Sequence, residues 1–173
     1  MKSIAILFIV GVSIFVTGGW IWLKRQPIGP IPHPSPREEM DKDSAIEKWS
    51  LTDSEWKERL SDEVYYILRE KGTERAYSGS LWDNKEKGTY YCAGCDLPLF
   101  SSETKFESGT GWPSFWEPIA FNSLEEHEDW LLFYKRIEVT CFRCGGHLGH
   151  VFSDGPPPTG KRYCMNSLAL TFR

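Results

Sequence analysis

The hydrophobic positions begin with a long uninterrupted run. Residues 4–23 form 20 consecutive positions without a charge, bounded by Lys2 and by Lys24-Arg25. At about 1.5 Å per residue in a helix, this run would cover the roughly 30 Å hydrocarbon core of a bilayer. It predicts an uncleaved transmembrane signal-anchor within residues 1–25. The alternative is a cleaved secretory signal with a cut near Gly18-Gly19, although no clear small-residue cleavage motif follows the run.

The charges beside this run bear on its orientation. Lys2 and the amino terminus on one side nearly balance Lys24 and Arg25 on the other. The positive-inside rule therefore barely distinguishes the two possible orientations of the run in the membrane. A short segment ahead of a first apolar run usually stays inside the cell. We therefore expect a membrane localisation with a single N-terminal pass, and a globular domain on the outer (periplasmic or extracytoplasmic) face.

A proline-rich segment separates this run from the rest of the chain. Five prolines fall within residues 27–36. Such a sequence favours the polyproline conformation, which acts as a semi-rigid spacer. We interpret residues 26–45 as a stalk and residues 46–173 as the folded domain.

The pattern of the folded domain changes from helical to strand-like. Thr52 and Glu55 have the spacing of a capping box, which predicts a short helix after Thr52. A second apolar face, ending near Gly72, predicts another helix. The runs 89–92, 131–139 and 168–172 favour strands, with glycines and prolines between them. The domain is therefore predicted to be mainly β, with antiparallel sheets and short N-terminal helices.

Composition narrows the possible functions. Aromatic residues make up 14% of the chain and include eight tryptophans, which indicates an aromatic-rich core or pocket. The formal net charge is −4 and no cluster of lysine or arginine is present. Nucleic-acid binders normally show a basic patch, so we expect no nucleic-acid partner.

Four of the five cysteines form two C-x-x-C pairs. Glycines beside both pairs allow tight turns that aim two thiolates at one point. Two such turns complete the tetrahedral four-thiolate shell that Zn²⁺ prefers, and a closed shell has a structural role. The alternative for each pair is a disulfide or a redox-active couple. We predict one structural zinc ion bound by Cys92, Cys95, Cys141 and Cys144.

The fifth cysteine, Cys164, is left without a partner. Arg162 lies two residues before it, so on a strand the two side chains would share a face. A nearby cation favours the reactive thiolate form of a cysteine. Cys164 is therefore a candidate nucleophile, and the alternative is a buried, inert cysteine.

Two further clusters are candidates for chemistry. His147 and His150 lie three residues apart and could serve as acid–base groups, although a lone histidine is more often structural. Residues 108–116 combine glycines with aromatic side chains that could line a small apolar pocket. Core packing is the alternative interpretation for this second cluster.

Taken in order, these motifs resemble those of the methionine-R-sulfoxide reductases of the B class. The resemblance covers about residues 50–173 and leaves out the predicted anchor and stalk. Several long motifs in register are far more specific than a single C-x-x-C pair. The motifs are Gly72-Thr-Glu-Arg75, Gly88-Thr-Tyr-x-Cys92-Ala-Gly-Cys95, Lys105-Phe-x-Ser-Gly-x-Gly-Trp112-Pro-Ser-Phe115, His147-Leu-Gly-His150-Val-Phe152 and Arg162-Tyr-Cys164-x-Asn166-Ser167.

This resemblance implies an Mss4-like fold and a reaction. Cys164 would attack the sulfoxide sulfur of oxidised methionine in proteins. The resemblance further implies that His147, His150 and Asn166 hold a water and help to protonate the sulfoxide oxygen. Trp112 would form the wall of the pocket for the methyl group. Arg162, beside the nucleophile, is the other predicted substrate-binding residue.

Many members of this family carry a second, resolving cysteine where this chain has Thr110. The resemblance therefore implies a cycle with one cysteine, completed by a thioredoxin-like protein or a small thiol. The principal alternative function is a non-enzymatic, zinc-braced module that binds proteins, because a fold alone does not decide function.

Overall fold

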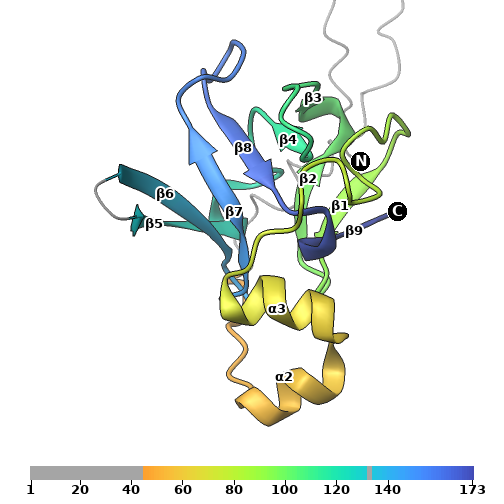
Figure 1. The fold of residues 1–173 in the computed structure, drawn as a ribbon, viewed down its shortest axis with the longest axis vertical. Helices are drawn as coiled ribbons and strands as arrows, with labels where there is room; N and C mark the ends of the chain where they lie inside the picture. Colours follow the sequence, from red (N-terminus) through yellow and green to blue (C-terminus); the bar gives the residue numbers. More distant parts are fainter. Residues whose placement is uncertain (1–44, 132–133) are drawn as a thin grey trace, which may run out of the picture. The chain divides into compact units, whose positions relative to one another are not determined.

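The computed structural model describes residues 45–131 and 134–173, which form two helices and two antiparallel sheets (Figure 1). The helices are α2 (Asp53–Arg59) and α3 (Asp62–Glu70). Nine strands follow: β1 (Thr89–Cys92), β2 (Pro98–Ser101), β3 (Lys105–Phe106), β4 (Ser114–Phe115), β5 (Leu124–Leu131), β6 (Tyr134–Cys141), β7 (His147–Phe152), β8 (Arg162–Met165) and β9 (Leu170–Phe172). Short 3-10 helices are η1 (Ser102–Thr104), η2 (Phe121–Ser123) and η3 (Ser167–Ala169).

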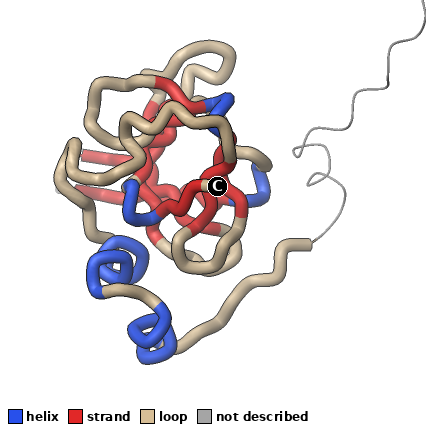
Figure 2. The backbone as a smooth tube through the Cα atoms, turned by 90° about the vertical axis from the view of Figure 1, so that its right-hand side faces the viewer, coloured by secondary structure: helices blue, strands red, loops and turns tan. Residues whose placement is uncertain are grey.

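The strands pair into one small and one large sheet. The small sheet has the order β2-β1-β9 and the large one β3-β4-β8-β7-β6-β5. Every pairing between these strands is antiparallel. Figure 2 shows both helices together on one side of the strands. The predicted fold class, mainly β with antiparallel sheets and short N-terminal helices, is confirmed.

Local sequence signals account for the ends of both helices. The capping box predicted at Thr52 and Glu55 is formed in both directions. The second helix ends at Glu70, two residues before the predicted stop, and Lys71 takes the left-handed conformation (φ 57°). Gly72 lies against the Tyr66 ring: a Cβ there would lie 2.2 Å from it, so any larger residue would displace this half-exposed side chain.

Two of the three predicted strand segments have different boundaries. The segment 89–92 matches β1. The segment 131–139 is divided between the end of β5 and the start of β6, which pair with each other. The segment 168–172 begins in η3 and becomes extended only at Leu170. Apolar runs do not mark where a chain reverses, so these boundaries depended on the tertiary pairing.

An aromatic cluster joins the two sheets, as the composition suggested. Phe100 of β2 stacks on Phe115 of β4 with 4.3 Å between ring centroids. Tyr90 of β1 meets the same Phe115 ring edge-on at 4.9 Å, and Tyr163 of β8 lies 5.8 Å from Phe100. All four rings are buried. Because the large sheet carries Cys164 on β8, this core fixes the strand that bears the candidate nucleophile.

The structure corrects the predicted membrane localisation. Among residues 45–131 and 134–173, no helix has the length and apolar character needed to cross a bilayer. The longest helix of this part of the chain has nine residues, which span only about 14 Å. The predicted single-pass anchor with an outer-face domain is therefore withdrawn. The segment 1–25, together with the stalk up to residue 44, lies outside the described residues.

Candidate active site and metal centre

Two matching turns hold the paired cysteines. Cys92 ends β1 and Cys141 ends β6, and each carbonyl accepts a hydrogen bond from an N–H four residues later. The donors are Asp96 at 2.9 Å and Gly145 at 2.8 Å. Both donors adopt left-handed φ values, 57° and 65°. The first turn thus depends on Asp96 where the second uses a glycine.

The four sulfurs converge on one point. Their Sγ atoms lie within 4.8 Å of one another. The separations are 3.6 Å between Cys92 and Cys144 and 3.5 Å between Cys95 and Cys141. A tetrahedral shell with Zn–S bonds of about 2.3 Å places its sulfurs about 3.8 Å apart, so the cluster fits Zn²⁺. All four cysteines are buried and free of disulfides. The shell has no open position, so the zinc site is structural.

The N-terminal helices cover this metal centre. Arg59 of α2 donates to the carbonyl of Gly94 at 2.9 Å, and Arg69 of α3 donates to that of Cys144 at 3.0 Å. A Cβ on Gly94 would come within 3.1 Å of Leu68 on α3, so this glycine allows the helix to approach. Each helix is therefore tied to a different cysteine turn.

Cys164 lies half-buried on β8, in a cavity of about 170 Å³. Three other predicted site residues line the same cavity: Trp112, His150 and Asn166. The β7–β8 register places His150 directly opposite Cys164. The tertiary structure thus brings Trp112 and His150 to the segment that carries Cys164 and Asn166.

His150 belongs to a charged group on β5, β6 and β7. Its Nε2 atom lies 2.9 Å from Oδ2 of Asp129, and the same oxygen accepts a hydrogen bond from Arg136 at 2.5 Å. The hydrogen bond with His150, helped by Arg136, lowers the pKa of Asp129 against the opposing effect of burial. Asp129 is therefore a carboxylate that orients the His150 ring beside Cys164.

His147 occupies a different environment from His150. It is 3% exposed and does not line the cavity of Cys164. Its Nδ1 atom lies 2.7 Å from Glu138, which also binds Lys71 at 2.7 Å. Burial lowers the pKa of His147 although Glu138 acts in the other direction. Its buried Nε2 atom has no protein partner, and the two histidine rings are 5.4 Å apart.

Asn166 is held at both ends of its amide. Oδ1 accepts from the N–H of Glu74 at 3.1 Å, and Nδ2 donates to the carbonyl of Leu148 at 3.1 Å. The Glu74 carbonyl in turn accepts from Nε1 of Trp112 at 3.2 Å. The carboxylate of Glu74 accepts from the backbone N–H groups of Ser167 and Leu168. Glu74 therefore positions two walls of the cavity at once.

Thr110 lies next to Cys164, at the end of a chain of hydroxyl groups. Its Oγ1 atom is 3.7 Å from Sγ of Cys164 and 2.8 Å from Oγ of Ser108. Ser114 donates to Ser108 at 2.8 Å. The loop reaches this position because Gly109 and Gly111 adopt positive φ values of 72° and 85°.

Arg162 shares the partly exposed face of β8 with Cys164, as its spacing predicted. It does not line the cavity of Cys164. Its guanidinium makes two hydrogen bonds of 2.9 Å to Asp154 and lies over the Phe152 ring at 4.3 Å. The hydrogen bond to Asp154 raises the pKa of Arg162, and Cys164 contributes in the same direction. Arg162 and Cys164 are therefore close enough to interact electrostatically.

The sequence did not single out the carboxylates that organise this site. Glu74 lay within a recognised motif, but no function followed from the motif itself. Asp129 and Glu138 lie on β5 and β6 among many charged residues, and nothing in their spacing marks them. Their partners became identifiable only when the strand register was known.

The fold and this site define a class: a zinc-braced antiparallel β domain that presents a half-buried cysteine to a histidine and an amide. The family description "SelR domain" matches residues 60–173. The chain belongs to the SelR domain family.

Named relatives agree with this assignment. The chain is 59% identical over 129 residues to a peptide methionine sulfoxide reductase MsrB from Methanosarcina barkeri, covering 75% of this chain and 89% of the relative. It is 53% identical over 125 residues to the enzyme of that name from Agrobacterium fabrum, covering 72% and 93%. It is 57% identical over 121 residues to the chloroplastic peptide methionine sulfoxide reductase B1 of Arabidopsis thaliana, covering 70% and 60%.

The metal centre gives a first testable prediction. Replacing Cys95 with serine removes one of four thiolates, so the protein should lose about one equivalent of zinc and melt at a lower temperature, because metal binding contributes directly to folding. Metal analysis and thermal unfolding measure both effects. Cys164→Ser is the matched control and should keep its zinc. A Cys95→Ser protein that lacks zinc yet melts like the wild type would contradict the structural role.

Proposed function

We propose that this protein is a peptide-methionine (R)-S-oxide reductase, an oxidoreductase that reduces the R epimer of methionine sulfoxide in proteins. One observation carries the proposal. Cys164 lies in a cavity with His150, Asn166 and Trp112, in a chain of the SelR domain family. Relatives that share more than half of their aligned residues with this chain bear the name peptide methionine sulfoxide reductase.

Cys164 is the nucleophile of the proposed reaction. Its thiolate attacks the sulfoxide sulfur and forms a sulfur–sulfur bond, while the protonated sulfur–oxygen bond breaks and the oxygen leaves as water. A water then adds to the Cys164 sulfur and breaks the sulfur–sulfur bond, which releases methionine, a proton and a sulfenic acid on Cys164. Methionine gains two electrons and Cys164 loses two. The Thr110 hydroxyl lies 3.7 Å from Sγ, and Arg162 shares the partly exposed face of β8 with Cys164.

Protonation makes the sulfoxide oxygen a leaving group. His150, opposite Cys164 and oriented by Asp129, is the group placed to supply this proton. The unpaired, buried Nε2 of His147 suits a hydrogen bond to a water behind it. One N–H of the Asn166 amide binds Leu148, which leaves the other for the oxygen or that water.

The Trp112 ring supplies an apolar wall for the methyl group. It is held through Nε1, so its face is fixed relative to Cys164. A chiral sulfoxide with one apolar and one polar slot available fits in a single orientation, which selects the R epimer. Zinc takes no part in this step, since its four thiolates leave no open position.

The activity is tested with two substrates. With dithiothreitol as the reductant, the protein should reduce a peptide containing methionine-R-sulfoxide and leave the S epimer unchanged. Cys164→Ser should abolish turnover while retaining zinc and the folded state. Chromatography of the products measures both. Absence of turnover in the zinc-loaded wild-type protein would favour the alternative of a non-enzymatic binding module.

The proposed role of His150 as the proton donor is tested by replacing this residue. His150→Ala should lower kcat by roughly 10²- to 10⁴-fold, as is typical for the loss of a positioned proton donor. The melting temperature should change little, because Asp129 keeps its partner Arg136. His127→Ala, on the exposed part of β5, is the matched control and should retain full activity. Unchanged turnover in His150→Ala would remove His150 from the mechanism.

The reduction of Cys164 depends on a thiol from outside the chain. The described cysteines other than Cys164 all belong to the zinc site, and position 110 is a threonine. After one turnover without reductant, we expect a sulfenic acid at Cys164 that dimedone traps, seen by mass spectrometry. Two equivalents of an external thiol then release water and form their own disulfide.

A single substitution should convert this one-cysteine cycle into one that passes through an internal disulfide. In Thr110→Cys the new sulfur would lie near Cys164, so an internal disulfide should form and the dimedone adduct should disappear. Thr110→Ser is the control and should keep the adduct. A disulfide between Cys164 and a zinc cysteine in the metal-loaded wild type would contradict the one-cysteine cycle.

A further inference from the structure

The strands β6 and β7 separate where the large sheet approaches its edge. Their pairing runs from Thr140–His147 to Ile137–Val151 and goes no further in the described chain. Beyond that point β6 continues with β5 down to Tyr134, while β7 continues with β8 up to Phe152. Figure 1 shows the two strands diverging from their junction. We call the space between them the β6–β7 fork.

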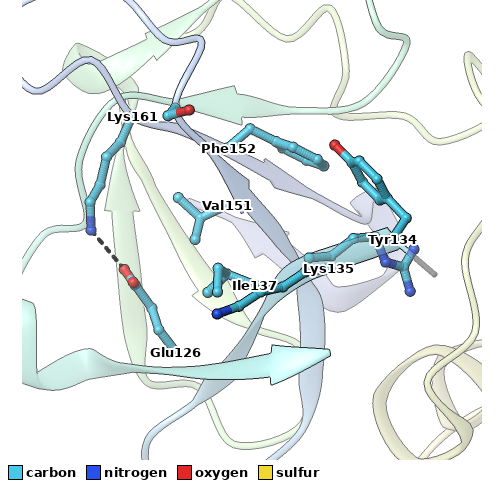
Figure 3. A pocket seen from close by; sticks show the side chains of 9 residues that line it. Glu126, Tyr134, Lys135, Ile137, Val151, Phe152 and Lys161 are labelled. Atoms are coloured by element: carbon cyan, nitrogen blue, oxygen red, sulfur yellow. Dashed lines mark hydrogen bonds and ion pairs between the residues drawn. The ribbon is translucent and has the colours of Figure 1, made fainter. Parts of the chain in front are cut away.

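The fork contains a cavity of about 310 Å³, a volume within the range of ligand-binding pockets. Figure 3 shows Ile137 and Val151 in its middle and the side chains of Tyr134 and Phe152 together at one end. Tyr134 is 64% exposed, which is high for a ring beside an apolar floor. The fork therefore offers an aromatic and aliphatic surface to a partner.

This cavity adjoins the cavity of Cys164. Arg136 and Phe152 line both of them. Arg136 belongs to the charged group around His150, and Phe152 lies under the Arg162 guanidinium. A chain whose methionine sulfoxide enters the Cys164 cavity thus has the fork as the adjoining surface for its neighbouring residues.

The charges around the fork are already paired. Lys161 binds Glu126 at 3.0 Å, Lys135 binds Glu128 at 2.5 Å, and Arg136 binds Asp129. Each described charged residue that lines the fork therefore has an ion-pair partner, so none of them is left to select an acidic or basic partner. The surface therefore suits a neutral, extended segment with an apolar side chain, and the diverging edges of β6 and β7 offer backbone groups to such a strand.

We propose that the β6–β7 fork is the surface that binds the polypeptide flanking the oxidised methionine, with its apolar floor taking a neighbouring side chain of an extended segment. This inference rests on the proposed function and extends it from the reacting side chain to its neighbours. Tyr134 is the main contact of the flanking chain and has no part in the chemistry.

The test compares two substrates with one set of variants. One substrate is a neutral peptide of seven residues with methionine-R-sulfoxide at its centre and leucine on either side. The other is N-acetyl-methionine-R-sulfoxide, which has no flanking residues. Dithiothreitol is the reductant, so that no reductant protein competes for the surface. The variants are Tyr134→Ala and Tyr134→Phe, with Phe121→Ala as the control, because Phe121 is 74% exposed and does not line the fork.

We expect Tyr134→Ala to lower kcat/KM for the peptide at least about fivefold, through KM, as for a contact aromatic ring. Its kcat/KM for N-acetyl-methionine-R-sulfoxide should be unchanged. Tyr134→Phe should keep the wild-type preference, and Phe121→Ala should alter neither substrate.

Other results would overturn the inference. Equal losses on both substrates in Tyr134→Ala would assign the ring to the fold or to the Cys164 cavity. No loss on the peptide would remove the fork as its binding surface. If the same assay repeated with thioredoxin as the reductant then showed a defect, the fork would be assigned to the reductant. A zinc-loaded wild-type protein that reduces neither substrate would refute the proposed function, and the inference with it.

Discussion

The buried cluster of four cysteine sulfurs is the constraint on which the other parts of the domain depend. One cysteine turn follows β1 of the small sheet and the other follows β6 of the large sheet, so a single metal ion joins them. The loop closed in this way contains 45 residues between the pairs. Closing a long loop restricts the unfolded chain more than closing a short one. The helices α2 and α3 then pack on the turns through Arg59 and Arg69, so their position also depends on the metal.

The metal centre and the candidate nucleophile are connected through adjacent strands. β6 ends at the zinc ligand Cys141 and pairs with β7, which carries His150. β7 pairs with β8, which carries Cys164 opposite that histidine. On the other side, Lys71, directly after α3, binds the buried Glu138 that holds His147. The zinc site is therefore connected through adjacent strands to the residues that set the separation of His150 and Cys164.

Carboxylates do much of the positioning around Cys164. Asp129 orients His150, Glu138 orients His147, and Glu74 positions Asn166 and Trp112 through its backbone. Each is paired with a histidine, a cation or backbone N–H groups, which the burial of Glu74 and Glu138 requires. The charges near the β6–β7 fork are likewise paired, which leaves its apolar floor as the feature that a partner would recognise. The Cys164 thiol thus lies in a polar environment whose geometry is preset before a substrate enters.

The sequence by itself determined the features that depend on local chemistry: the capping box at Thr52, the two C-x-x-C turns, the strand-rich pattern, and Cys164 as the cysteine left over. Its ordered motifs identified the family. Only the tertiary structure separated His150, which faces Cys164, from His147, which is buried against Glu138. It also showed that Arg162 binds Asp154, and that Glu74 and Asp129 organise the site. These contacts join residues on different strands, and strand register depends on the pairing and packing of the whole sheet, which spacing along one chain does not encode.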